Sequence, residues 1–77
     1  MNLTPVKANM TELEISQGRI LFSYKTPVAF FDNLSGVYMK TTKKWSNTTT
    51  RHINQWVNGR VIPMPQEFFD NLIAGVK

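Results

Sequence analysis

Alternating apolar and polar positions dominate the first half of the chain. In the run GRILFSYKTPVAF, residues 18 to 30, the alternating apolar positions are Ile20, Phe22, Tyr24, Val28 and Phe30. This period is typical of a half-buried strand. The upstream segment TELEIS alternates in the same way, and the short connection SQGR contains Gly18. The two strands are therefore predicted to form a hairpin.

A third strand is predicted in GVYMKTTKKW, residues 36 to 45, which is rich in β-branched and aromatic residues. The turn-forming residues DNLSG precede it. Pro27 has no backbone N–H to donate to a neighbouring strand. We therefore expect it at a sheet edge, a bulge or a strand break.

After Trp45 the apolar period changes from two residues to 3.6. Ser46 or Asn47 can cap a helix that begins near Thr48, and Gly59 can end it in the left-handed conformation. One face of this helix carries Thr49, Ile53, Trp56 and Val57. A second helix is predicted to start at Pro65, with an apolar stripe of Phe68, Phe69, Leu72 and Ile73.

The five letters FFDNL occur twice, at residues 30 to 34 and 68 to 72. We interpret the first copy as a strand end followed by a turn, and the second as the middle of a helix, because their flanks do not match. In the alternative interpretation both copies are helical, with one helix starting at Pro27 and ending at Gly36. The pattern alone leaves open whether residues 27 to 36 form strand and turn or a short helix.

The predicted fold is a single α+β domain spanning residues 1–77, a three-stranded antiparallel meander followed by two short helices. The expected core consists of Ile20, Phe22, Tyr24, Val28, Ile53, Trp56, Phe69 and Leu72. The chain contains no cysteine, which excludes disulfides and thiolate chemistry. Because no membrane-length apolar run or signal peptide is present, we expect a cytoplasmic protein without a membrane partner.

Positive charge is concentrated in the centre of the chain. No Asp or Glu occurs from Asn33 to Gln66, whereas the overall net charge is +4. The basic residues of this window are Lys40, Lys43, Lys44, Arg51 and Arg60. A phosphate backbone or an acidic protein is the partner that such a distribution favours.

The sequence does not point to an enzyme. His52 is the only histidine, and no carboxylate has a spacing that would place it beside this ring. There is no glycine-rich phosphate loop and no metal-ligand spacing. We therefore expect no catalytic residues, no metal, no cofactor and no small-molecule substrate.

Nucleic-acid binding is the function that we expect. The five central cations can contact phosphates, and the polar helix face carries Arg51, Gln55 and Asn58, which are residue types that read base edges. Trp45 and Tyr38 can stack on unpaired bases. A helix-turn-helix motif is incomplete here, because the segment before the helix is predicted to be a strand.

The alternative function is inhibition of a host protein. In the predicted three-stranded sheet, VYMKTT would be an uncovered edge strand that can accept a partner strand. The same cations could dock an acidic host protein. The oligomeric state does not follow from the sequence.

Two segments carry a resemblance to a family. LFSYKTPVAFF, residues 21 to 31, and WSNTTTRHINQWVNG, residues 45 to 59, resemble a group of short, functionally uncharacterised proteins of bacteria and their phages. The resemblance implies a small stand-alone protein of phage type and brings no known activity. Its signature positions are Ser23, Tyr24, Thr26, Pro27, Thr49, His52 and Ile53. The role it implies for them is structural: a bend at Tyr24 to Pro27 that packs against the helix start, with Thr49 and His52 bonded to it.

Overall fold

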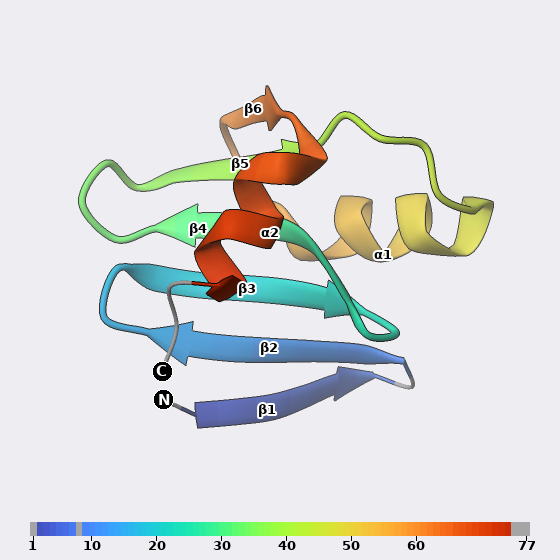
Figure 1. The fold of residues 1–77 in the computed structure, drawn as a ribbon, viewed down its shortest axis with the longest axis horizontal. Helices are drawn as coiled ribbons and strands as arrows, with labels where there is room; N and C mark the ends of the chain where they lie inside the picture. Colours follow the sequence, from blue (N-terminus) through green and yellow to red (C-terminus); the bar gives the residue numbers. More distant parts are fainter. Residues whose placement is uncertain (1, 8, 75–77) are drawn as a thin grey trace.

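The computed structural model describes residues 2–7 and 9–74 and shows an α+β fold with a six-stranded mixed sheet. In chain order the elements are β1 (Asn2–Lys7), β2 (Met10–Ile15), β3 (Gly18–Ser23), β4 (Thr26–Asp32), β5 (Val37–Thr41), α1 (Asn47–Trp56), β6 (Val61–Met64) and α2 (Gln66–Ala74). The strands lie side by side in sequence order. β1 to β5 are antiparallel, and β6 is parallel to β5. α1 supplies the crossover that a parallel pair requires (Figure 1).

The predicted three-stranded meander is wrong in strand number. The run predicted as one strand over residues 18 to 30 is a hairpin of β3 and β4, because the chain turns at Tyr24 and Lys25. Tyr24 has a positive φ of 60°, and its side chain is 52% exposed, so its assignment to the core was also wrong. The alternation continues through the two-residue turn, and this continuity hides the break.

The two other strands that the pattern missed are the edge strands β1 and β6. Each contains a proline, Pro5 or Pro63, which breaks the sequence signal of a strand. Edge strands tolerate proline because one side of their backbone has no neighbour to pair with. With β6 in place, β5 lies inside the sheet between β4 and β6. The prediction that VYMKTT forms an accepting edge is therefore wrong.

The helices cover opposite faces of the sheet, as Figure 1 shows with α2 in front and α1 behind. Successive strand residues point to opposite faces, and the neighbours Ile20 and Leu21 accordingly belong to different apolar clusters. On the α1 side the buried residues are Met10, Leu21, Val28, Ala29 and Ile53. On the α2 side they are Leu13, Ile20, Phe30 and Phe69. The fold thus has three layers and two small cores.

Pro27 lies next to a bulge, one of the places expected for it. Leu21 pairs with Ala29 and Phe22 pairs with Pro27, so Val28 is the extra residue of β4. The bulge lets two successive residues, Val28 and Ala29, join the α1-side core. Residues 27 to 36 are strand and turn, which excludes the helical alternative for the first FFDNL copy. The second copy lies in α2, as predicted.

The helix boundaries differ slightly from the predictions. Ser46 is the N-cap of α1: its hydroxyl accepts a hydrogen bond from the Thr49 N–H. The helix ends at Trp56, and an extended Val57 caps it. Gly59, which has a φ of +85°, lies in the following loop and is not the residue that ends the helix. α2 begins at Gln66, one residue after the predicted Pro65.

Candidate functional site

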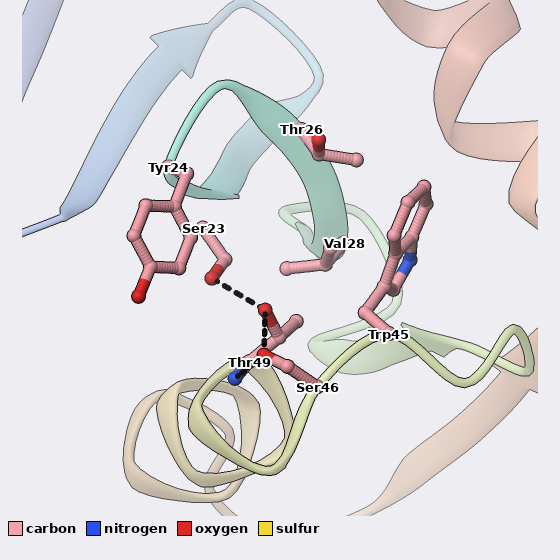
Figure 2. Close-up of a pocket in the computed structure, with 7 residues that line it drawn as sticks. All are labelled: Ser23, Tyr24, Thr26, Val28, Trp45, Ser46 and Thr49. Carbon is pink, nitrogen blue, oxygen red and sulfur yellow. Dashed lines mark hydrogen bonds between the residues drawn. The ribbon is translucent and has the colours of Figure 1, made fainter.

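A shallow pocket of about 200 Å³ opens between the β3–β4 turn and the start of α1. Its lining combines four hydroxyl-bearing Ser and Thr residues with two aromatic rings and one valine: Ser23, Tyr24, Thr26, Val28, Trp45, Ser46 and Thr49. We refer to it as the hydroxyl pocket. Figure 2 shows Tyr24 on one side and Trp45 on the opposite side, with the serines and threonines between them. The two segments of the family resemblance, far apart in the chain, meet here.

The floor of the hydroxyl pocket is a chain of hydrogen bonds. The Ser23 and Thr49 hydroxyl oxygens are 3.0 Å apart, and the Ser46 hydroxyl donates to Thr49 Oγ1 at 3.3 Å. Ser23 Oγ also lies 2.9 Å from His52 Nδ1. Ser23 and Thr49 are buried, so these bonds satisfy groups that have left water. They join the β3–β4 hairpin to the first turns of α1.

The Ser23–His52 contact superficially resembles a nucleophile and its base. However, the Ser23 side chain is only 2% exposed, and its hydroxyl also bonds Thr49. No carboxylate among the described residues is hydrogen-bonded to His52, although a base in such a pair needs an orienting group. The described residues also contain no cluster of His, Cys, Asp or Glu that could hold a metal ion. This arrangement supports hairpin–helix attachment better than catalysis.

Trp45 is held in place at the mouth of the hydroxyl pocket. Its indole N–H donates to Gln66 Oε1 at 3.2 Å, and the Lys43 ammonium lies 4.3 Å from the ring centroid. The indole is nevertheless 42% exposed. Most large apolar side chains in so small a protein are needed in the core. An ordered, exposed tryptophan is therefore a candidate binding group.

Gln66 holds Trp45 in place, and its side-chain amide makes four hydrogen bonds. The sequence did not single out this residue. Its oxygen accepts from Thr41 Oγ1 at 2.7 Å as well as from Trp45. Its nitrogen donates to the Pro27 carbonyl at 2.8 Å and to Asp70 Oδ1 at 3.1 Å. Both acceptor sites and both donors are occupied. No spacing signal reveals such a residue, because its partners come from four different segments.

The cations singled out from the sequence do not form one cluster. Lys43 and Lys44 lie in the loop before α1, and Arg51 is exposed on the helix itself. Arg60 follows the end of α1, and its carbonyl accepts from Tyr38 at the beginning of β5. At 1.5 Å per residue, the ten residues of α1 span roughly 15 Å, which separates Arg60 from the two lysines. Lys40 is exposed on β5, midway between these positions.

The residues expected to contact bases differ in exposure and in their position relative to α1. Gln55 is exposed on α1, whereas Asn58 lies beyond the helix end. Tyr38 is half-buried, with its ring edge-on to Trp56 at 5.4 Å, so it belongs to the packing under α1. Sequence reasoning also missed Lys25, which is exposed between the lining residues Tyr24 and Thr26. We call Lys25, Lys43 and Lys44 the basic rim of the pocket.

A second polar cluster occupies the other end of α1. The Trp56 indole donates to Glu12 Oε1 at 2.9 Å, and Arg19 forms an ion pair with the same oxygen at 3.6 Å. The Arg19 guanidinium also lies 4.8 Å from the centre of the Phe31 ring. Arg19 is therefore committed to the fold and is not a free contact for a ligand.

None of the described helices is long and apolar enough to cross a membrane. Comparison with curated proteins and with solved structures gives no significant match. A family model does match residues 1–71, which include both sides of the hydroxyl pocket and all of the basic rim. The chain therefore belongs to a family of unknown function, DUF8033.

Proposed function

We propose that the protein is a non-enzymatic nucleic-acid-binding protein that uses the hydroxyl pocket and the basic rim. The observation that carries the proposal is the pair of exposed rings, Tyr24 and Trp45, on opposite sides of the pocket. Lys43 lies against the Trp45 ring, and Lys25 follows Tyr24 in the chain. Exposed aromatic rings next to cations are the usual composition of a surface that stacks bases and contacts phosphates. The proposed location is the cytoplasm, that of the host cell if the gene is carried by a phage.

The distribution of ion pairs supports the proposal. The ion pair within the described part of the chain is between Arg19 and Glu12, and it lies at the far end of α1. The basic-rim lysines have no such carboxylate partner among the described residues, so their charge is available to phosphates. On α2, the Asp70 carboxylate accepts a hydrogen bond from the Gln66 amide, the group that also holds Trp45. We expect the phosphate chain to follow the basic rim, Lys25, Lys43 and Lys44, toward the exposed Arg51.

The proposal is tested by binding of labelled single-stranded DNA, duplex DNA and RNA across a salt series. Counterion release predicts that the logarithm of the affinity falls linearly with the logarithm of salt concentration, with a slope of roughly −0.7 per phosphate contact on a single strand. The double substitution Lys43→Gln with Lys44→Gln should make this slope shallower by about 1.4. Arg60→Gln is the matched control and should leave it unchanged.

Two results would refute the proposal. One is the absence of binding to all three nucleic acids at low salt. The other is a salt slope that the Lys43 and Lys44 substitutions leave unchanged, because binding would then not use the basic rim.

A protein partner is the second candidate, now at a different edge from the one expected. Among the described residues no strand pairs with the outer side of β1, and two of its apolar residues, Leu3 and Val6, are 67% and 42% exposed. A phage-encoded inhibitor could add this edge to the sheet of a host protein. In that case Leu3→Glu should abolish binding of the purified host partner, whereas the Lys43 and Lys44 double substitution should not. The opposite pattern would reject the β1 edge.

A further inference from the structure

We infer that the hydroxyl pocket takes one unpaired nucleobase, so that the ligand is a single-stranded nucleic acid. This inference rests on the proposed nucleic-acid binding and names the ligand class. In a duplex, neighbouring base pairs cover the faces of each base, and only base edges are accessible in the grooves. The Trp45 ring can stack only on a base whose face is free, which a single strand provides.

Both rings are held in place before a ligand binds. Trp45 is fixed by its hydrogen bond to Gln66, whose amide makes four hydrogen bonds. The Tyr24 backbone, with a φ of 60°, is held by its N–H, which donates to the Asn9 carbonyl at 2.7 Å, and the Tyr24 ring lies beside the His52 ring with centroids 6.0 Å apart. A left-handed conformation is unfavourable for a residue with a side chain, and such residues cluster at functional sites. Because both rings are ordered beforehand, little conformational entropy is lost on binding.

The size of the pocket suits a single base. Its volume of about 200 Å³ is smaller than the roughly 300 to 1,000 Å³ of ordinary small-molecule sites. The pocket is open to solvent, and Figure 2 shows it between the β3–β4 turn and the start of α1. One flat ring can enter it while the attached sugar and phosphate remain outside. Lys43, whose ammonium lies 4.3 Å from the centre of the Trp45 ring, could then contact one of those phosphates.

The hydroxyl groups of the pocket differ in whether they already have partners. Those of Ser23, Ser46 and Thr49 bond to one another and are committed to the floor of the pocket. Among the described residues, the hydroxyls of Thr26 and Tyr24 have no side-chain hydrogen-bond partner, although both residues line the pocket. A hydroxyl both donates and accepts, so these two groups can pair with the edge of any base. The geometry therefore favours base binding with little sequence preference.

The experiment compares strands with and without bases, and deoxyribose with ribose. The probes are an oligothymidine, an oligouridine and an abasic strand with the same number of phosphates. Stacking of one base on an aromatic ring predicts that the abasic strand binds about fivefold or more weakly. DNA and RNA should bind similarly if the base alone is recognised, and the two base-bearing arms measure any contribution of the 2′-hydroxyl.

Two substitutions of Trp45 localise the effect. Trp45→Ala should weaken oligothymidine binding to the level of the abasic strand and leave abasic binding unchanged. Trp45→Phe keeps a stacking ring and should retain the preference for bases. The quenching of tryptophan emission that oligothymidine causes in the wild type should disappear in Trp45→Phe, because Trp56 is packed against the α1-side core.

The outcomes separate this inference from the proposed function. Equal binding of the abasic strand and oligothymidine by the wild-type protein, with a normal salt slope, overturns the pocket inference and leaves the basic rim as a phosphate-binding surface. Binding to none of the probes at low salt overturns both. The comparison of oligothymidine with the abasic strand uses the wild-type protein, so it tests the pocket inference even if Trp45→Ala fails to fold.

Discussion

At the residue scale, the β3–β4 hairpin is attached to α1 by three polar side chains, those of Ser23, Thr49 and His52. Their hydrogen bonds are 3.0 and 2.9 Å long, and the Tyr24 and His52 rings lie with centroids 6.0 Å apart. These contacts explain why serine, threonine and histidine occur together in the two segments of the family resemblance. Neutral intramolecular hydrogen bonds of this kind contribute roughly 0.5 to 1.5 kcal/mol each.

We predict that His52→Ala destabilises the protein by about 1 to 2 kcal/mol, because it removes the hydrogen bond to Ser23 and the ring contact with Tyr24. The matched control is Asn54→Ala, at an exposed position of the same helix. Histidine and asparagine have similar helix propensities, so replacement by alanine stabilises the helix by a similar free energy in both variants. Urea denaturation measures the two free energies of unfolding. An equal stability of the two variants would show that His52 does not secure the hairpin.

At the scale of the elements, Gly18 lets β3 and β4 approach each other closely. A Cβ atom at Gly18 would lie 1.8 Å from the Phe31 carbonyl oxygen and 2.9 Å from its carbonyl carbon. The obstacle is backbone rather than a flexible side chain, so the strands would have to separate. From the sequence, Gly18 was recognised as a turn residue, but its contact with a strand 13 residues later was not visible.

We predict that Gly18→Ala destabilises the protein by more than about 3 kcal/mol or prevents folding, because the pairing of β3 with β4 must be distorted. Gly36→Ala is the control. Gly36 has a φ of +69°, and a Cβ atom added there would meet no other atom within 4 Å, so only the backbone preference, about 1 kcal/mol, is lost. Circular dichroism and urea denaturation of both variants give the comparison. Similar losses in the two would rule out a close approach at Gly18.

At the scale of the whole molecule, one sheet separates two small cores. Ile53 of α1 packs in one core, and Phe69 of α2 packs in the other. The sheet lies between these two side chains, so they belong to separate clusters. Neither core is large enough to stabilise a domain alone, and the shared strands should make them unfold together.

We therefore predict that the protein unfolds in a single transition and that the losses of unfolding free energy caused by one substitution in each core add up. Ile53→Val and Phe69→Leu should each cost about 1 kcal/mol. The double variant should match the sum within about 0.5 kcal/mol, because substitutions without shared contacts are independent. Urea unfolding followed by tryptophan fluorescence and by circular dichroism tests both points. Two separate transitions would mean that the layers fold independently, and a large coupling energy would mean that the cores are connected through the sheet.

The sequence by itself determined the elements whose signals are local. The start of α1 near Ser46, the stripe from Thr49 to Val57 on its buried face, and the helical second FFDNL copy followed from local signals. The structure then excluded a helix at the first copy. Composition also located the positive charge. Each of these depends on residues within a few positions of one another, where propensity and periodicity act.

Only the tertiary structure decided the rest. The prolines of β1 and β6 mask strands that form because a neighbouring strand supplies their hydrogen bonds, and the Tyr24 turn shows no break in the alternation. Gln66 and Lys25 belong to the candidate site because the fold brings distant segments to one pocket. Arg60 was separated from the other cations by the length of α1. The physical reason is common to all: pairing and packing partners are chosen by the whole chain, and a local pattern contains no information about them.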